Sequence, residues 1–550
     1  MRHVFHLGTL GALAIAAATA CGAAHAADGW AATHTMKHDT ANAVAGAAMQ
    51  AGEAVKVYLA LHIRNQGEMD ALTTALMTGQ SSRHITSEEF MARHAPSQAQ
   101  VDAVVAHLRN SGFADIEVSK NHMLVTASGT AAAIQAGFNT GMRHFSVDGR
   151  DAIANTSDAQ VPAHLGGIVN AVLGLQTVHQ HHVMSKKFEG VSTQDKVGHQ
   201  PTDFPVLYGA SGLPSATKST IGIISEGDIS ASLTDLAAFA TGAGFPAPTT
   251  HTIIADTPGT DTSGVIEWDI DSQSSLSMAG GTVKAINFYV ASTLNDGPLT
   301  AAYNAAVTDN TAQAINVSIG ECEINAQQSG ETAASDAVFQ VAVAQGQVFT
   351  VSSGDSGSYQ CGSKLGGGSY PAVSPYVMAI GGTSLVTTGA TTYVSESLWS
   401  CSSLLSCEFN GGEGGGPSKT EAAPAWQIAS GVLGTSTQRG EPDISFDADP
   451  ATGMLVHFGN TQPQYGGTSL AAPIFAGAWV RLQSQNNNTL GYPAAQLYQV
   501  GPTPTGAKFL HDITSGSNGG YTTGPGWDQA SGFGSMDIGK VAKLIKATKG

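Results

Sequence analysis

The sequence predicts an α/β fold, in which a parallel sheet covered by helices on both faces follows a smaller α+β unit. Three observations indicate this. The chain has 550 residues, about twice what one hydrophobic core usually supports, so two folded units are expected. From about Ser219, short apolar runs alternate with helix-length segments, which is typical of a parallel sheet covered on both faces. From about Val55 to that point, alternating strands and amphipathic helices indicate the smaller unit.

Hydrophobic periodicity assigns the elements of the smaller unit. The segment 55–63 alternates like a strand, and a second strand is predicted over 122–129. Apolar residues recur at helical spacing in three further segments. The helices predicted from them cover 67–77, 97–112 and 130–139, and the second ends at Gly112.

The stretch 177–203 is polar and lacks periodicity, which is typical of a linker. Three of its histidines, His179, His181 and His182, could bind a metal ion or respond to pH. We interpret them as solvated linker residues, because polar segments of this composition commonly carry histidines without a ligand.

In the larger unit, five apolar runs predict the strands of the sheet. They cover 220–228, 285–291, 314–321, 347–357 and 376–386. Ligands of parallel sheets bind beyond the carboxyl ends of the strands. The segments 318–321 (SIGE) and 353–357 (SGDSG) stand at such ends and are therefore candidate parts of a site.

The charge is acidic and unevenly distributed, with a formal net charge of −18. Residues 1–190 contain 12 Lys and Arg and 14 Asp and Glu, a balance of −2, whereas residues 191–550 contain 12 and 28, a balance of −16. A surface of this sign disfavours nucleic acid and anionic membranes as partners. It is also the balance expected of a protein that works at low pH, where many carboxyls are neutral.

The first 26 residues have the features of a signal peptide. A basic start (MRHVF) precedes an apolar run too short to span a bilayer stably, and AHA forms an A-x-A cleavage site before Ala27. An N-terminal core helix is the plain alternative. Lipid attachment at Cys21 is disfavoured, since Ala18 stands where a lipoprotein usually has Leu. We therefore expect a secreted protein, extracellular or periplasmic.

Export makes disulfides the expected state of the cysteines. Without Cys21, the chain retains Cys322, Cys361, Cys401 and Cys407, and four cysteines permit three pairings. We favour Cys401–Cys407, which closes a short loop, together with Cys322–Cys361. Metal ligation is the competing interpretation, but these cysteines form no C-x-x-C pair and lie near no histidine cluster.

The segment 465–473 (YGGTSLAAP) is typical of a catalytic serine that opens a buried helix. Ser469 would lie at the positive end of the helix dipole, and Pro473 would fall in the first turn, where a missing N–H costs little. A serine that merely caps a buried helix would look the same. The usual histidine base is missing, because none of the histidines after residue 200 stands in an H-G-T-H motif. They are His251, His457 and His511.

Two carboxyls offer a different base. Glu267 and Asp271, in GVIEWDIDSQ, are four residues apart and would share one face of a helix. Two carboxyls held together cannot both ionise cheaply, so one retains a proton. Such a pair can accept the serine proton through Glu267 while Asp271 orients it. A solvent-facing acidic helix is the alternative, but the neighbouring residues are apolar. Asp269 should point elsewhere.

The segment around Ser469 also resembles that of subtilisin-type proteases. Asp355, in SGDSG, stands where such proteases have an Asn that stabilises the oxyanion. An ionised carboxylate would repel an oxyanion, so Asp355 can assist only when it is protonated and donates its O–H. Two carboxyl devices without a histidine indicate an enzyme that works in acid.

Three motifs in this chain order resemble the sedolisins, the serine-carboxyl peptidases: E-x-x-x-D at 267–271, S-G-D-S-G at 353–357 and G-T-S-x-A-x-P at 467–473. The bacterial pepstatin-insensitive type, that of pseudomonalisin and xanthomonalisin, is the most similar. Residues from about 50 to 175 resemble the family's pro-domain. The resemblance covers nearly the whole chain after the signal peptide.

This resemblance implies a subtilisin-like fold and a domain order. The implied order is a signal peptide at 1–26, a pro-domain at 27–178, a linker with the activation site at 179–200 and a catalytic domain at 201–550. The implied catalytic residues are the base Glu267, its partner Asp271, the oxyanion acid Asp355 and the nucleophile Ser469. Glu226 stands where some members extend the carboxyl chain by one acid, although SEGD could equally be a turn.

The resemblance also implies one Ca²⁺ ion, since the segment 509–537 is similar to the family's calcium loop. The implied ligands are the side chains of Asp512 and Asp528 and the carbonyls of Ile513, Gly524 and Gly526. Calcium prefers such a mixture of carboxylate and carbonyl oxygens. A Gly-rich surface turn is the alternative, and the part between Ile513 and Gly524 is shorter than in some members.

We therefore expect a secreted, acid-acting serine-carboxyl endopeptidase that is made as a self-processing proenzyme. Its substrates would be proteins and peptides, and its pro-domain would serve as intramolecular inhibitor and folding aid. We expect a monomer without nucleic-acid or membrane partners. A subtilisin-type serine protease is the first alternative, which the missing histidine motif disfavours. A catalytically silent exported binding protein on the same fold is the second, and the presence of all four catalytic residues disfavours it.

Overall fold

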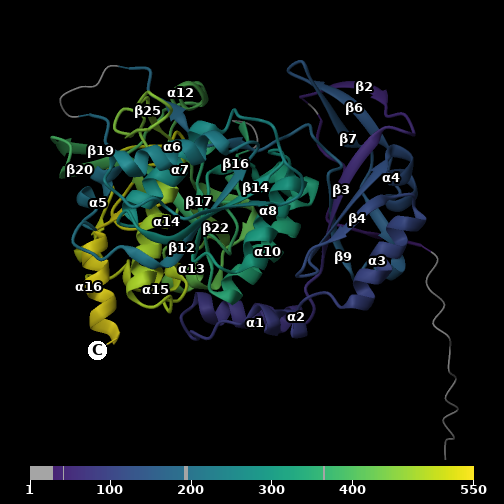
Figure 1. Cartoon of the computed structure of the whole chain (residues 1–550), viewed down its shortest axis with the longest axis horizontal. Coiled ribbons are helices and arrows are strands. Elements are labelled where there is room, and N and C mark those ends of the chain that lie inside the picture. Colours follow the sequence, from purple (N-terminus) through teal and green to yellow (C-terminus); the bar gives the residue numbers. More distant parts are fainter. Residues whose placement is uncertain (1–28, 41, 191–195, 363–365, 550) are drawn as a thin grey trace, which may run out of the picture.

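The structure, a computed structural model, describes residues 29–40, 42–190, 196–362 and 366–549. The predicted signal peptide lies outside the described residues. The described chain forms two units that pack against each other (Figure 1). The smaller unit precedes strand β10 (His182–Val183), and the larger unit follows it.

The smaller unit is built on a four-stranded antiparallel sheet with the order β4-β5-β3-β9. The strands are β3 (Ala54–Leu61), β4 (Ala114–Val118), β5 (Leu124–Thr130) and β9 (Val169–Leu173). Helices α3 (Gln98–Asn110) and α4 (Ala131–Phe138) pack against it. The predicted strands and helices are thus confirmed, with ends that differ by a few residues.

The central strand β3 buries both of its faces. Val57, Leu59 and Leu61 belong to the core of the smaller unit, because alternate side chains of a strand point to the same side. Tyr58 and Ala60, on the other side, pack with alanines of the larger unit. That second face lies against the helices α8 (Asp296–Asp309) and α10 (Glu331–Gln345).

Helices α1 (Gln66–Met77) and α2 (Ser87–Arg93) lie at the bottom of Figure 1. α2 and α3 each begin with a capping box, in which the first and fourth residues satisfy each other's free backbone N–H groups. α1 packs on α10, α13 (Ala425–Ser430) and α15 (Pro493–Val500). The smaller unit therefore holds the larger one through its sheet and through α1.

Two small sheets complete the smaller unit. One consists of β2 (Val44–Ala48), β6 (Met142–Val147) and β7 (Arg150–Asn155). In the other, β1 (Trp30–Ala32) pairs with β8 (Gln160–Pro162).

The larger unit contains an eight-stranded sheet in the order β13-β14-β12-β15-β17-β19-β20, in which β23 also pairs with β19. All pairs are parallel except β19 with β20. The strands are β12 (Ala216–Glu226), β13 (Thr250–Ile254), β14 (Val283–Ala291), β15 (Ala314–Val317), β17 (Val348–Ser352), β19 (Met378–Thr388), β20 (Thr392–Leu398) and β23 (Ile444–Asp447).

Helices cover both faces of this sheet, as its continuous apolar runs predict. On one face, α6 (Ser230–Gly242) packs on α7 (Val265–Met278), and α7 packs on α14 (Thr468–Gln485). On the other, α8 packs on α10. A glycine allows α7 and α14 to approach closely, because a Cβ at Gly477 would lie 2.3 Å from the carbonyl oxygen of Ser275.

The remaining strands and helices are short or lie at the periphery. The strands are β11 (Lys186–Lys187), β16 (Ile319–Cys322), β18 (Ser369–Tyr370), β21 (Gly416–Ala422), β22 (Gln438–Glu441), β24 (Met454–Leu455), β25 (Gln464–Gly466), β26 (Leu510–His511) and β27 (Ser535–Met536). The helices are α5 (Phe204–Leu207), α9 (Glu323–Ser329), α12 (Leu404–Asn410) and α16 (Ile538–Lys549). Both favoured disulfides, Cys322–Cys361 and Cys401–Cys407, are present.

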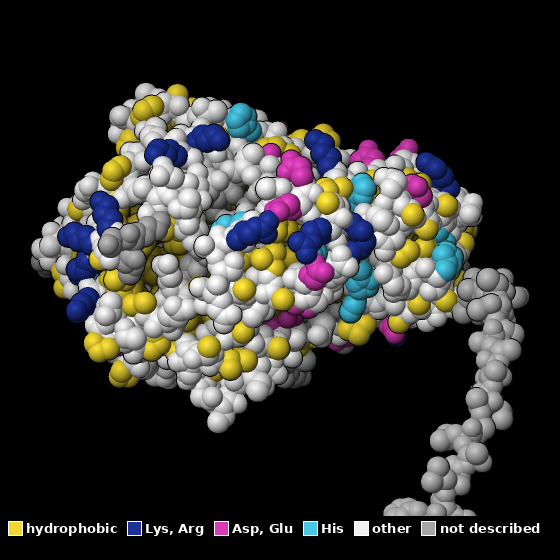
Figure 2. All heavy atoms as spheres, turned by 90° about the horizontal axis from the view of Figure 1, so that it is seen from below, with side chains coloured by type: hydrophobic (Ala, Val, Ile, Leu, Met, Phe, Trp, Pro, Cys, Tyr) yellow, Lys and Arg dark blue, Asp and Glu magenta, His cyan; other side chains and the backbone are white. Residues whose placement is uncertain are grey.

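Much of the acidic charge lies inside the larger unit. Fifteen Asp and Glu residues between Glu226 and Asp449 are buried, out of 28 in residues 191–550. The face drawn in Figure 2 accordingly carries scattered acidic side chains among mostly neutral ones. The expectation of a strongly acidic surface is therefore wrong in part, because these carboxyls lie inside the unit, where burial favours their neutral form. Among the described helices, none is long and apolar enough to cross a membrane.

Candidate active site

The four predicted catalytic residues converge at one edge of the sheet. Asp355 follows β17, Ser469 is the second residue of α14, and Glu267 and Asp271 lie in the first two turns of α7. Parallel strands end at the same edge, and α7 and α14 lie side by side. All four side chains are buried.

Glu267 and Asp271 face the interior from one side of α7, as their spacing predicts. Burial raises the pKa of Glu267 to about 8, and the nearby hydroxyls of Ser185 and Ser469 oppose this rise. Burial, and then the charge of Glu267, raise the pKa of Asp271 well above its ordinary value. The pair therefore retains a proton at acid and neutral pH.

Asp271 has a partner that the sequence did not reveal. The Ser318 hydroxyl donates to Asp271 Oδ1 at 2.6 Å, and the Asn316 amide donates to Ser318 Oγ at 2.9 Å. Ser318 follows β15, in the SIGE segment expected at a strand end, which was the available signal. Among the described residues, Asp271 Oδ2 and both oxygens of Glu267 have no partner with hydrogen-bond geometry. Asp271 is thus oriented, whereas Glu267 is free to exchange a proton.

Ser469 lies beside this pair. Its Oγ is 3.4 Å from the carbonyl oxygen of Ser318 and is close enough to Glu267 to lower the pKa of that carboxyl. Its N–H belongs to the first helical turn, where N–H groups lack helical acceptors, and donates instead to the Met184 carbonyl at 3.1 Å. Ser469 therefore has its hydroxyl group and an N–H that polarises the Met184 carbonyl in the same place.

Asp355 contacts the start of α14. Its Oδ1 accepts the N–H of Thr468 at 2.8 Å and the Thr468 hydroxyl at 2.9 Å. Its Oδ2 is buried without a hydrogen-bond partner in the described part of the chain. Burial raises the pKa of Asp355 to about 7, although the Thr468 bonds and Lys186 lower it. Below that pH, Oδ2 carries a proton that it can donate.

An extended segment of the chain crosses the site. β10 pairs antiparallel with β16, and β11 pairs antiparallel with β25. Met184 and Ser185 lie between these pairs, and the Met184 N–H donates to the Ser318 carbonyl at 3.1 Å. Peptides bind to many proteins in this way, as an added strand. The predicted linker therefore continues from the smaller unit into the site; its residues 191–195 lie outside the described ones.

Gly467 brings three parts of the site together. Its φ of 108° lies in the region that favours glycine. A Cβ there would lie 2.1 Å from the Met184 carbonyl oxygen and 2.7 Å from Asp355 Oδ2. Both oxygens thus lie beside the same point, next to the N–H of Ser469.

Pro473 lies inside α14, at its sixth residue, and the prediction of a first-turn position is wrong. The helix begins at Thr468, so the N–H missing from Pro473 is one that would have donated to the Ser469 carbonyl. The carbonyl of the candidate nucleophile is therefore left without its helical donor.

Two further acids near the pair differ from it. Asp269 is buried on α7, where burial and the charge of Asp235 on α6 raise its pKa to about 9. It points away from the pair, as expected. Glu226 ends β12, and burial, followed by Asp261, raises its pKa to about 7. Within the described chain, no hydrogen bond joins Glu226 to Glu267 or Asp271, so the geometry gives no extension of the carboxyl pair.

The predicted calcium ligands lie between β26 and β27. Asp528 Oδ2 accepts the N–H of Gly524 at 2.8 Å, and Asp512 Oδ2 accepts that of Gly526 at 3.0 Å, so the two ends of the loop are joined. No main-chain N–H of the described residues donates to the carbonyls of Ile513, Gly524 or Gly526. Carbonyls without an N–H donor, in the same loop as two carboxylates, are oxygen ligands of the kind that Ca²⁺ prefers, so the chemistry of these residues fits the ion.

The linker histidines differ in their surroundings. His181 is buried, with Nε2 2.7 Å from Glu331 Oε2. His179 is half-buried and His182 is exposed. The interpretation of all three as solvated is wrong for His181, because pairing of β10 with β16 carries this part of the linker into the larger unit.

Known proteins share both units. Residues 41–178 match the family model of the pro-kumamolisin activation domain, and residues 251–534 match that of the subtilase family. The chain is 42% identical to sedolisin of Pseudomonas sp. (strain 101), over 97% of this chain and 95% of that protein. It is 40% identical to xanthomonalisin of Xanthomonas sp. (strain T-22), over 97% of this chain and 74% of that protein.

A solved structure agrees with these relatives. It is Pseudomonas sedolisin, a serine-carboxyl proteinase, complexed with two molecules of pseudo-iodotyrostatin. It shares 44% identity and a TM-score of 0.60 with this chain, and the match covers 65% of this chain and 99% of that one. With an activation domain ahead of a subtilase-like unit, this chain belongs to the sedolisin family of serine-carboxyl peptidases.

Proposed function

We propose that this chain is the proenzyme of a secreted serine-carboxyl endopeptidase that acts in acid and cuts its own linker between Met184 and Ser185. The observation that carries the proposal is the hydrogen bond of 3.1 Å from the Ser469 N–H to the Met184 carbonyl, beside Asp355 Oδ2. A carbonyl held in this way is polarised for attack by a serine hydroxyl.

In the proposed acylation step, Ser469 Oγ attacks the Met184 carbonyl carbon and its proton passes to Glu267. The Ser469 N–H and the protonated Oδ2 of Asp355 donate to the developing oxyanion. Collapse of the tetrahedral intermediate breaks the bond to the Ser185 nitrogen, which takes the proton from Glu267. Water then hydrolyses the acyl-enzyme with Glu267 again as base, which returns Ser469 to its hydroxyl form.

Asp271 would act through Glu267. It is held by Ser318 at 2.6 Å, and it shares the buried environment that keeps one proton on the pair. Before the attack, the pair holds one proton and one negative charge that both carboxyls share. The proton from Ser469 neutralises this charge as the oxyanion forms. Asp271 is thus a positioning residue.

The residue before the proposed cleavage bond is apolar and fully buried. Met184 is 0% exposed. A Cβ at Gly320 would lie 2.7 Å from Met184 Cε, so the glycine leaves room for a long side chain. We infer a preference for bulky apolar residues at this position of the substrate.

Acid action follows from the protons that the site needs. Asp355 donates only while protonated, and its pKa is raised to about 7. The donor is therefore present below this pH and is lost as the pH rises through it. Export is proposed from the N-terminal sequence, and a single calcium ion is proposed at Asp512, Ile513, Gly524, Gly526 and Asp528.

The smaller unit is proposed to act as inhibitor and folding aid. Its linker occupies the site, and its sheet is anchored by polar contacts to the larger unit. These include Tyr58 Oη to Asp256 Oδ2 at 2.7 Å and Asn121 to Asn304 at 2.6 Å. Cleavage after Met184 would free the site, while the smaller unit would stay bound to the larger unit through these contacts.

The test is the time course of maturation. Proenzyme purified at neutral pH is shifted to about pH 4, where Asp355 is protonated and can donate to the oxyanion. N-terminal sequencing and mass of the earliest fragments should give a new chain that begins at Ser185, at a rate independent of protein concentration. Ser469→Ala, checked for an unchanged melting temperature, should stay intact. Processing of Ser469→Ala at the wild-type rate, or a different first N-terminus, would refute the proposal.

A further inference from the structure

The strand register fixes which linker residue occupies each position of the proposed substrate site. His182 lies opposite Gly320 and Val183 opposite Ile319, and Met184 provides the carbonyl at Ser469. His181 is therefore the fourth residue before the cleavage bond, the P4 position. Its backbone is anchored as well, since its N–H donates to the Leu294 carbonyl at 3.0 Å.

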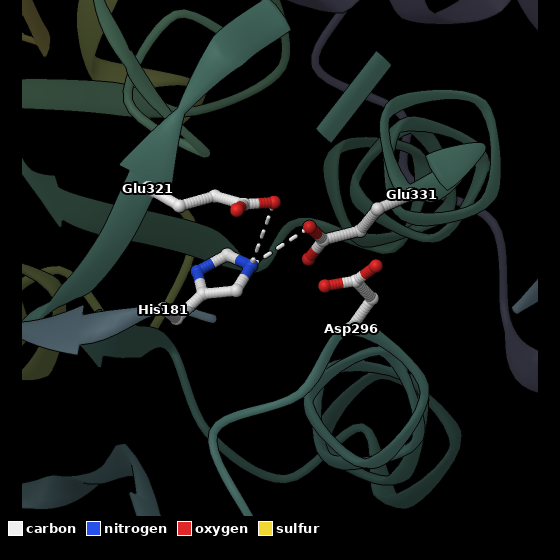
Figure 3. Close-up of side chains that lie close together, drawn as sticks. All are labelled: His181, Asp296, Glu321 and Glu331. Atoms are coloured by element: carbon white, nitrogen blue, oxygen red, sulfur yellow. Dashed lines mark hydrogen bonds and ion pairs between the residues drawn. The ribbon is translucent and has the colours of Figure 1, made fainter. Parts of the chain in front are cut away.

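The His181 side chain points between three carboxyls of the larger unit (Figure 3). Its Nε2 lies 2.7 Å from Glu331 Oε2 and 3.7 Å from Glu321 Oε1. Asp296 is the third acid. One ring nitrogen of His181 and one carboxyl oxygen of each acid all lie within 4.8 Å of one another. All four residues are buried.

The three acids come from separate elements of the larger unit. Asp296 opens α8, Glu321 lies in β16 and Glu331 opens α10. They all follow the proposed cleavage bond, whereas His181 precedes it. Release of the linker would therefore remove the histidine and leave the acids in the mature enzyme.

The acids offer more acceptors than one imidazole uses. Both oxygens of Glu321, Glu331 Oε1 and Asp296 Oδ1 are buried and accept no hydrogen bond from an N–H group of the described residues, although Glu321 and Glu331 lie close enough to shift each other's pKa. Asp296 Oδ2 accepts from Gln176 at 2.8 Å. Unpaired buried acceptors are costly, and a side chain with several N–H donors would satisfy them. A basic group also opposes the rise in pKa that burial imposes on Glu321, as His181 does.

We propose that Asp296, Glu321 and Glu331 form a substrate subsite for a basic side chain at P4, which His181 occupies in the proenzyme. This inference rests on the proposed function, because it takes the linker as a bound substrate. It adds a substrate class: chains with His, Lys or Arg four residues before the cleaved bond. The main chain of β16 and Leu294 would hold the backbone, and the three acids would read the side chain.

The direct test uses the matured wild-type enzyme and peptides built on its own linker, with the P4 residue varied and the others kept. Lys, Arg and His at P4 should give kcat/KM values roughly tenfold or more above Gln and Leu, as expected for charge-assisted hydrogen bonds. Variation at P3, the position of exposed His182, serves as the matched control and should change kcat/KM by less than about threefold.

The variant test compares ratios, so it does not depend on absolute activity. Glu331→Gln should reduce the Lys-to-Gln ratio at P4 by roughly tenfold, whereas Glu408→Gln, at an exposed acid of α12, should leave it unchanged. In the proenzyme, His181→Ala should slow maturation more than His182→Ala. If Glu331→Gln does not fold, the wild-type peptide series decides alone.

Three results would overturn the inference. These are equal kcat/KM for Lys, Gln and Leu at P4, equal maturation rates of the two histidine variants, or a stoichiometric metal ion bound at this cluster in purified proenzyme. A mature enzyme that cleaves peptides without discrimination at P4 refutes the subsite but leaves the proposed function standing. A chain that cleaves no peptide refutes the proposed function.

Discussion

Replacement of Asp355 separates two explanations for a requirement for acid. In Asp355→Asn, the amide oxygen can accept the two Thr468 bonds that Oδ1 now accepts at 2.8 and 2.9 Å. The amide NH₂ takes the place of Oδ2, beside the Met184 carbonyl. An amide donates at every pH, whereas the carboxyl donates only below its pKa of about 7. The variant should therefore keep activity and lose its alkaline decline.

The magnitudes follow from the contacts. Asp355→Ala removes the donor, and loss of one oxyanion donor costs on the order of 100- to 1000-fold in kcat, about 2.7–4 kcal/mol. It also leaves the Thr468 N–H and hydroxyl without their acceptor, at about 1–3 kcal/mol of stability. Above a pH of about 7, kcat of the wild type should fall by about tenfold per pH unit, while that of Asp355→Asn should not.

The assay is kcat against pH for the three mature proteins, each checked for folding by thermal denaturation. Variants that do not mature alone are processed by a trace of wild-type enzyme, which is then removed. Equal and complete inactivity of Asp355→Asn and Asp355→Ala would refute the donor role, and would make Asp355 an anchor for the start of α14. An alkaline decline in Asp355→Asn identical to that of the wild type would refute the assignment of the pH dependence.

Three further predictions concern the base, the calcium loop and a buried acid. Glu267→Gln should lose at least about 100-fold in kcat at every pH, since an amide cannot act as base; near-normal kcat would exclude Glu267. Removal of calcium by EDTA should lower the melting temperature, because an ion at 100 times its Kd contributes about 2.7 kcal/mol, and Asp528→Ala should abolish this difference; an unchanged melting temperature would contradict the site. Burial raises the pKa of Asp269 from 3.8 to about 9. The contribution of this protonated acid to the stability of the fold is therefore fully present below the lower value and is lost as the pH rises through the higher one. Asp269→Asn should flatten the fall in melting temperature across this range, and an unaltered slope would contradict the burial argument.

The places of the candidate catalytic residues in the fold could be predicted, because a sequence pattern marks each of them. Glu267 and Asp271 are spaced for one helix face, Asp355 follows an apolar strand, and Ser469 opens a helix of small residues. The two sheets could be predicted for the same reason, since alternation marks strand β3 of the smaller unit and continuous apolar runs mark the strands of the larger one.

The P4 acids could not be found in this way. Asp296, Glu321 and Glu331 are single acids at the start of helices or on a short strand, where an acid commonly has a local role at the helix dipole. Only the parallel topology brings α8, β16 and α10 together. The burial of His181 could not be predicted either, because the strand β10 that follows it has only two residues and shows no periodicity. Its burial depends on the pairing of β10 with β16, more than a hundred residues away.

The start of α14 shows a second limit. The preference of proline for the first turn of a helix predicts that α14 begins close to Pro473. The contacts of Thr468 with Asp355 and of Ser469 with Met184 instead fix its start at Thr468. Burial of the acids in the larger unit was likewise hidden, because net charge counts residues without regard to their position.

Covalent labelling of the nucleophile tests the central assignment most directly. Mature enzyme is mixed at about pH 4 with a peptide ester that carries Met at the cleaved position, quenched in stronger acid within the first turnover and digested for mass spectrometry. We predict one acyl group per enzyme, on Ser469, which is absent from Ser469→Ala. Full turnover without an adduct on Ser469, or an adduct on another residue that survives in Ser469→Ala, would contradict the assignment.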